Sequence, residues 1–136
     1  MDYMSLEDFE KTDTYKTFSE ENPSTGVLKV QVFTADQAIP IANAEIFITK
    51  VIGEDDVLFF SGKTNSSGII DNIILPAPIG DVDFENFEIP KYTTYNLVVN
   101  SEDYKKVKQY TVSMFGDVKV LQYVKINSSG GNMDGN

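Results

Sequence analysis

The amino-acid sequence predicts an all-β fold: a Greek-key sandwich of seven strands in two sheets, with an acidic arm at its N-terminus. Two observations carry this prediction. Seven short segments alternate apolar and polar residues with a period of two, the pattern of strands that are buried on one face. The connections between them are rich in Gly, Pro and Asn and recur at nearly regular spacing, as in two-sheet sandwiches. The length of 136 residues suits one domain with one core.

The first expected strand shows the alternation most clearly, because Leu28, Val30 and Val32 alternate with Lys29 and Gln31. The inner faces of the two sheets are expected to stack Leu, Val, Ile and Tyr side chains about 10 Å apart. The seven expected strands cover residues 27–33, 44–51, 57–64, 68–75, 94–99, 106–114 and 117–126.

The segment KTNSSGIIDNIILPAP (63–78) is predicted to be a structural corner and not a catalytic loop. Its Asn-Ser-Ser-Gly stretch supplies turn-forming side chains, and Gly68 is free to take the positive φ that a tight turn needs. Thr64 is expected to anchor this turn by local hydrogen bonds. Pro76 and Pro78 are expected to end the next strand, since neither has an N–H to donate.

The chain divides into three parts by composition. Residues 1–25 form an acidic arm, residues 26–127 the β-sandwich domain, and residues 128–136 a flexible tail rich in Gly, Asn and Ser.

The arm carries seven acids and two lysines, and its apolar residues recur at mixed helical spacing. It is predicted to be a short amphipathic helix, an extended segment docked on a neighbour, or a disordered leader. If it docks, its contact residues are Phe9, Tyr15 and Phe18.

The residue types that are missing exclude several classes of chemistry. The chain has no His, Cys, Arg or Trp. Most zinc sites and all nucleophile pairs that use His are therefore excluded, and no guanidinium is present to bind a phosphate in bidentate fashion. No enzymatic activity is expected.

The net charge is −10, from 21 acids and 11 lysines. A field of this sign disfavours nucleic acid and anionic membranes as partners, although it is equally typical of a solvated surface. The first residues lack the apolar stretch of a secretory signal, and no segment has the length of about 20 apolar residues that a membrane helix needs. Cytoplasmic, particle-associated and envelope-associated locations all remain open.

Residues 79–92 (IGDVDFENFEIPKY) interrupt the strand pattern with a long loop, and long loops in compact domains are often functional. The loop contains the only candidate metal site, for Ca²⁺, although it lacks the glycine and terminal glutamate of an EF-hand. A solvated acidic loop is the alternative, and no other cofactor is expected. The candidate ligands are Asp81, Asp83, Glu85 and Glu88.

Aromatic residues of the same loop form a candidate binding surface. Phe84, Phe87 and Tyr92 can make a platform for a sugar or a partner protein. The alternative is that the phenylalanines fold back onto the edge of the sandwich.

Several segments in order resemble the carboxypeptidase regulatory-like domain over about a hundred residues. They are AIPIANAEIFI (38–48), TNSSGII (64–70), LPAP (75–78), YNLVV (95–99) and SEDYKK (101–106). The resemblance implies a transthyretin-like, Ig-like Greek-key sandwich. Asn43 and Asp103 stand where that family has glycine, and Asn tolerates the left-handed conformation better than Asp. Enzymes that share this fold rely on His and Arg, or on His that binds iron, so those activities do not transfer to this chain.

The resemblance implies a non-catalytic binding or assembly module in a bacterial cell-envelope, spore or wall-hydrolase system. The alternatives are a phage virion or other particle component that uses the arm for subunit contacts, and a small glycosidase based on carboxylates. The expected partners are another protein or a cell-wall glycan, and a homo-oligomer or assembly subunit is also expected. Nucleic acid binding and membrane insertion are not.

Overall fold

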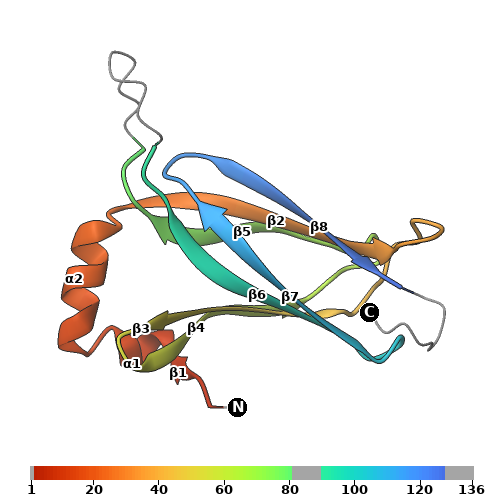
Figure 1. The fold of residues 1–136 in the computed structure, drawn as a ribbon, viewed down its shortest axis with the longest axis horizontal. Helices are drawn as coiled ribbons and strands as arrows, with labels where there is room; N and C mark the ends of the chain where they lie inside the picture. Colours follow the sequence, from red (N-terminus) through yellow and green to blue (C-terminus); the bar gives the residue numbers. More distant parts are fainter. Residues whose placement is uncertain (1, 81–89, 128–136) are drawn as a thin grey trace.

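The computed structural model describes residues 2–80 and 90–127, and it contains two β-sheets packed face to face (Figure 1). The five-stranded sheet has the order β1-β4-β3-β6-β7 and the three-stranded sheet the order β5-β2-β8. The strands are β1 (Met4–Ser5), β2 (Ser24–Thr34), β3 (Glu45–Ile52), β4 (Asp55–Lys63), β5 (Ile69–Ala77), β6 (Thr93–Ser101), β7 (Lys106–Met114) and β8 (Lys119–Ile126).

All seven expected strands are present in their expected places, and the expected count of seven is corrected to eight. The additional strand is β1, which has only two residues and pairs in parallel with β4, with Met4 opposite Val57. Two residues are too few to show a period, so the sequence pattern does not reveal this strand.

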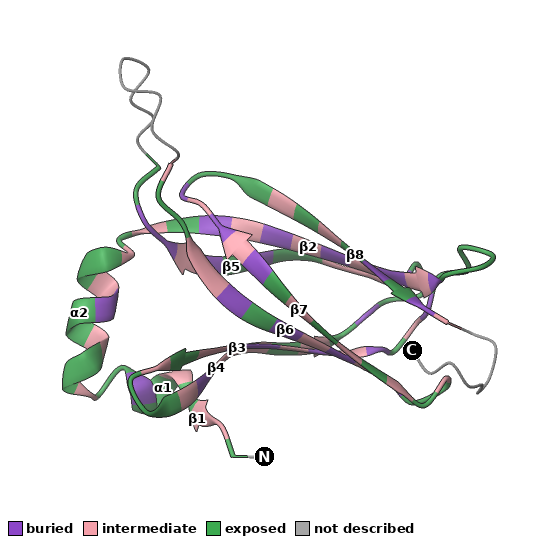
Figure 2. Cartoon of the chain, in the orientation of Figure 1, coloured by how far each residue is buried: buried purple, intermediate pink, exposed green. Residues whose placement is uncertain are grey.

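The core lies between the two sheets and is built from the alternate residues of each strand (Figure 2). In β2, Leu28, Val30 and Val32 are completely buried, while the residues between them are partly exposed. The facing sheet contributes Ile46 and Leu97, among others, to the same cluster. This burial is the dominant favourable contribution to folding, because it removes apolar surface from water.

The first part of the segment 63–78 forms the expected corner, but Pro76 does not end the next strand as expected, because β5 continues through it to Ala77. The Asn65 side chain accepts hydrogen bonds from the N–H groups of Ser67 and Ile69, and Gly68 has φ +74°. Thr64 is buried, but its bonds are not local as expected. Its hydroxyl donates to the Ile41 carbonyl at 2.7 Å and accepts from the Ala44 N–H at 2.9 Å. Thr64 therefore holds the connection between β2 and β3 against the end of β4.

The arm folds onto its own sandwich. It contains α1 (Leu6–Phe9) and α2 (Asp13–Glu21), which are capped at their N-termini by Ser5 and Thr12. The hydroxyl of Ser5 accepts from the Asp8 N–H at 3.1 Å, and that of Thr12 from the Tyr15 N–H at 3.3 Å. In Figure 1 the arm lies at one end of the molecule, with α1 and β1 beside β4.

A second apolar cluster attaches the arm to the five-stranded sheet. Phe9 and Phe18 are buried together with Val57 of β4. The rings of Phe9 and Phe18 lie 5.6 Å apart, edge to face, and Phe9 also contacts Phe59 of β4 at 6.3 Å. The arm thus covers the edge of β4. Neither of its described helices is long and apolar enough to cross a membrane.

Candidate functional site

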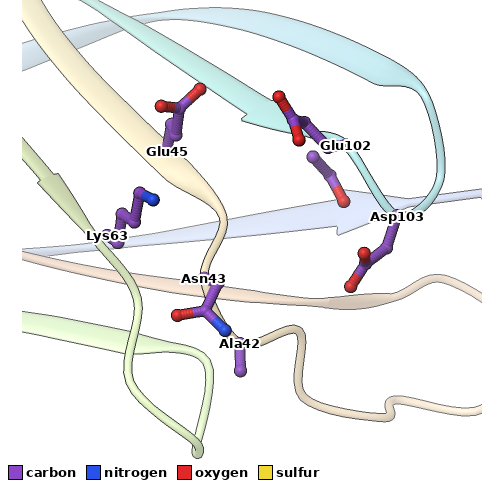
Figure 3. A pocket seen from close by; sticks show the side chains of 7 residues that line it. Ala42, Asn43, Glu45, Lys63, Glu102 and Asp103 are labelled. Atoms are coloured by element: carbon purple, nitrogen blue, oxygen red, sulfur yellow. The ribbon is translucent and has the colours of Figure 1, made fainter.

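A polar cavity opens at one end of the five-stranded sheet, where β3 begins and β4 and β6 end (Figure 3). Its volume is about 160 Å³. Seven residues line it: Ala42, Asn43, Glu45, Lys63, Ser101, Glu102 and Asp103. All seven come from strand termini and the turns beside them.

Strand order brings these residues together. Glu45 of β3 lies opposite Lys63 of β4 on one side and opposite Asn100 of β6 on the other. The Asn100 amide donates to the Glu45 carboxylate at 3.1 Å, which holds that carboxylate on the β6 side of the cavity. Glu102 and Asp103 follow directly after β6 and complete the wall.

The cavity has a net charge of −2, because Glu45, Glu102 and Asp103 are opposed only by Lys63. In Figure 3 the three carboxylates and the ammonium group surround one hollow. Lys63 makes no salt bridge in the described part of the chain.

Ser101 is the unusual member of the site. It is only 1% exposed, and its hydroxyl has no hydrogen-bond partner among the residues that the structure describes. A buried hydroxyl without a partner costs about 1–3 kcal/mol, so such groups are rare and call for an explanation. Ser101 lies at the cavity wall, with its hydroxyl buried.

Two left-handed residues shape the walls. Asn43 has φ +61°, as its substitution for glycine predicts, and its N–H donates to the Thr64 carbonyl at 2.9 Å. In the turn after β6 the left-handed residue is Lys105, with φ +53°, so Asp103 is not required to adopt that conformation. Asp103 is consequently free to line the cavity.

The carboxylates of the cavity do not form a metal centre. Within residues 2–80 and 90–127 no group of three or more carboxylates is arranged to hold a metal ion. The four candidate Ca²⁺ ligands, Asp81, Asp83, Glu85 and Glu88, lie outside the described residues.

The structure separates the expected aromatic contact residues. Phe9 and Phe18 are buried inside the protein and Tyr15 is partly buried, so Phe9 and Phe18 are not available to a neighbour as expected. Tyr92 is 52% exposed and its ring lies 5.5 Å from that of Phe115. Phe84 and Phe87 lie outside the described residues.

Sequence reasoning missed the cavity. Asn43 and Asp103 stood out only as substitutes for glycine in turns. Glu45 and Lys63 were residues of expected strands, and Ser101 was the first residue of the SEDYKK segment. The available signal was the accumulation of polar residues at the ends of three strands, and it becomes interpretable only when the strands are known to be neighbours.

Comparisons with known proteins agree on the fold. No family model matches the chain, and no curated protein does. Among solved structures, a 5-hydroxyisourate hydrolase from Klebsiella pneumoniae matches with a TM-score of 0.52 and 14% identity, over 77% of this chain and 92% of that one. The chain has a transthyretin-like fold.

A second solved structure with this transthyretin-like fold is transthyretin from Sparus aurata. It matches with a TM-score of 0.45 and 11% identity, over 71% of this chain and 89% of that one. At such identities the likeness shows the fold alone, because one fold carries many functions.

The comparisons correct the expected role. The structure that matches with a TM-score of 0.52 is named as a 5-hydroxyisourate hydrolase, and not as a cell-envelope, spore, wall-hydrolase or virion component or a glycosidase. The expectation of an inert assembly module, with its two alternatives, is therefore contradicted.

Proposed function

We propose that the protein binds a small organic amine in the cavity between the ends of β3, β4 and β6. The observation that carries this proposal is a cavity with two excess negative charges, at whose wall the buried Ser101 hydroxyl has no partner among the described residues. A buried polar group of this kind is expected to be satisfied in the functional state of a protein.

The charges favour a cationic group in the ligand. An ammonium group has three N–H donors and no acceptor, and Glu102 and Asp103 line the cavity with carboxylate acceptors. Hydrogen bonds between charged partners are roughly twice as strong as neutral ones. Lys63, on the opposite wall, favours an oxygen atom on the same ligand, as in an amino alcohol or an amino acid.

The volume limits the size of the ligand. A cavity of about 150 Å³ in a protein interior holds one benzene molecule, and this cavity has about 160 Å³. A molecule of roughly six to eight non-hydrogen atoms fits.

The test is a titration of the labelled protein followed by amide chemical shifts. Ethanolamine and glycine are the amine probes, and acetate is the probe without an amine. We expect both amines to shift the amides of residues 43, 45, 63 and 101–103, and acetate to leave them unchanged. Shifts with acetate alone, or no shift with either amine at 10 mM, roughly the weak limit of specific binding, would refute the proposal.

Variants make the test specific. Ser101→Ala is expected to weaken amine binding about fivefold to tenfold, since a hydrogen bond contributes about 1 kcal/mol. The unliganded variant should not lose stability, because the hydroxyl has no partner in the part of the chain that the structure describes. Asp103→Asn should weaken binding about tenfold. The control is Glu54→Gln, which removes a carboxylate from the turn between β3 and β4, away from the cavity. Unchanged binding in Ser101→Ala would contradict the role of the hydroxyl.

We also propose that the chain is a divergent carboxypeptidase regulatory-like domain with Greek-key connectivity. The left-handed Asn43, at a position where that family has glycine, supports this relationship. So does the turn at Gly68, which follows Thr64 at the spacing seen in the resemblance. An alignment of sequences that bridge this chain to known members would test it.

A further inference from the structure

The edges of the two sheets differ in how well they are protected. β4 pairs with β1 at Val57 and Leu58, and β5 is interrupted by a register shift opposite β2 and contains Pro76, which has no N–H. Within residues 2–80 and 90–127, β7 and β8 each pair on one side only. An unprotected edge strand presents a row of unpaired N–H and C=O groups that can pair with another chain.

The backbone of β8 shows which groups point to the open side. The carbonyls of Val118 and Ile126 accept hydrogen bonds from Val27 and Ala35, at 3.0 and 2.9 Å, so the even-numbered residues face β2. Consecutive residues of a strand direct their N–H and C=O groups to alternate sides. The N–H and C=O groups of Lys119, Leu121, Tyr123 and Lys125 therefore point to the open edge.

One of these outward groups is occupied by a side chain. The Gln122 amide donates to the Tyr123 carbonyl at 2.9 Å, in an exposed position. This side chain occupies a carbonyl to which an added strand would otherwise donate a hydrogen bond. Because the bond lies between exposed groups, an added strand can replace it easily.

The side chains of the same four residues form an exposed stripe on the outer face of the three-stranded sheet. Leu121 is 53% exposed and Tyr123 is 54% exposed, with Lys119 and Lys125 at either end. The Tyr123 ring contacts Phe33 of β2 at 6.1 Å. A hollow of about 30 Å³ between β2 and β8, lined in part by Leu121 and Tyr123, lies beside the stripe.

The charge of this stripe is opposite to that of the protein. The chain has a net charge of −10, yet three lysines, Lys29, Lys119 and Lys125, lie on these two strands, and Asp71 pairs with Lys119 at 3.2 Å. Such a local excess of positive charge favours an acidic partner.

We propose that β8 accepts an extended acidic segment of a partner protein as a fourth strand of the three-stranded sheet. Main-chain hydrogen bonds to residues 119, 121, 123 and 125 would provide affinity. Contacts with the exposed stripe would determine which side chains the partner segment can carry, as in other cases of strand addition. The segment carries apolar residues that face Leu121 and Tyr123, with an acid at each end to meet Lys119 and Lys125.

A second copy of the chain is a poorer occupant. Antiparallel pairing of two β8 strands centred on Gln122 would place Lys119 opposite Lys125 at both ends. Like charges directly opposite each other are destabilising. The acidic segment of a different protein has no such repulsion.

The experiment is amide hydrogen exchange on the full chain with a synthetic peptide, capped at both ends, of sequence Glu-Thr-Val-Thr-Tyr-Thr-Glu. The amides of residues 120, 122 and 124 face β2 and should exchange slowly from the start. We expect saturating peptide to slow exchange at residues 121 and 123 by at least tenfold, because strand addition gives partners to these outward N–H groups. A peptide with lysine in place of both glutamates should have no effect.

Charge reversal provides the matched variants. In the double variant Lys119→Glu and Lys125→Glu the preference should invert, so that the lysine peptide protects residues 121 and 123 and the acidic peptide does not. The control is Lys106→Glu with Lys108→Glu on β7, which should leave binding of the acidic peptide unchanged.

Three results would overturn the proposal. They are equal protection by both peptides, protection that appears on β7 and not on β8, and no protection by the acidic peptide at 1 mM. Protection of residues 121 and 123 that grows with protein concentration in the absence of peptide would identify a second copy as the occupant and would also overturn it.

Discussion

Gly68 shows how one residue determines the corner between β4 and β5. Its φ of +74° lies in the left-handed region that disfavours side chains. A Cβ atom at this position would lie 2.4 Å from the Val32 carbonyl oxygen and 3.1 Å from the Ile41 N, both of them backbone atoms. The Gly68 carbonyl in turn accepts from the Val32 N–H at 2.8 Å, so the turn is bonded directly to β2.

Substitution of this glycine is therefore expected to be severe. Gly68→Ala should lower the free energy of unfolding by about 3 kcal/mol or more, because the strain of the left-handed conformation adds to a backbone clash. Gly53→Ala is the matched control. Gly53 has φ +65° but no atom within 4 Å of the added Cβ, so only about 1 kcal/mol should be lost. Urea unfolding of both variants measures the difference, and equal losses would show that the close approach to Val32 is unimportant.

At the scale of elements, the arm is an integral part of the five-stranded sheet. Phe9 is 1% exposed and contacts the rings of Tyr15, Phe18 and Phe59. Because α1 and β1 cover β4, they also protect an edge that would otherwise be open to pairing with other chains.

Removal of the Phe9 ring should destabilise the whole protein. Phe9→Ala is expected to cost about 3–5 kcal/mol, the usual range for a buried phenylalanine. Tyr15→Ala, at a partly exposed position of the same cluster, should cost less. Urea unfolding and hydrogen exchange of residues 4–21 test this. If Phe9→Ala exposes the arm to exchange while the rest of the protein keeps its stability, the arm is an independent unit and the prediction is wrong.

At the scale of the whole molecule, Tyr95 connects the two sheets. It lies in β6 of the five-stranded sheet, and its hydroxyl donates to the Pro76 carbonyl of β5 at 2.6 Å. Its ring contacts Phe59 at 5.1 Å, and Phe59 contacts the aromatic cluster of the arm. Ring contacts thus connect the arm to Tyr95 in the five-stranded sheet, and the Tyr95 hydroxyl connects that sheet to the three-stranded sheet.

Because Tyr95 is buried, the free energy of unfolding is expected to depend on pH in the alkaline range. Burial raises the pKa of Tyr95 well above its usual value of about 10. Above that pH the unfolded chain ionises this tyrosine and the folded chain does not, so the unfolded state binds fewer protons. The free energy of unfolding should therefore fall by about 1.4 kcal/mol per pH unit as pH rises through 10–12. Burial lowers the pKa of Lys50 from its usual value of 10.5. Between the lowered pKa and 10.5 the unfolded chain binds more protons than the folded chain, so this lysine makes the free energy of unfolding rise with pH in that range.

Tyr95→Phe isolates the contribution of the hydroxyl. The variant should lose about 1–3 kcal/mol at neutral pH, since the Pro76 carbonyl is left without this partner. Its stability should then fall less steeply above pH 10 than that of the wild type. Denaturation in urea at pH 7–12 measures both effects, and parallel pH profiles would contradict the assignment.

Local pattern determined most of the fold. The alternation in β2, the turn chemistry around Gly68 and the left-handed Asn43 follow from residues that are neighbours in sequence, where periodicity and backbone preference act directly. The candidate site could be predicted from local pattern only in part, because Asn43 was recognisable as a turn residue but not as a residue that lines a cavity.

The sequence by itself determined that the chain is a two-sheet β-sandwich, and it determined where the seven long strands and their turns lie. Only the tertiary structure decided that β1 pairs with β4, with Met4 opposite Val57, and that Glu45, Lys63 and Ser101 share one cavity. It also decided that β8 is an edge strand among the residues that the structure describes. The physical reason is that alternation specifies the buried face of each strand but not its neighbours, which depend on how the whole set of strands packs around one core.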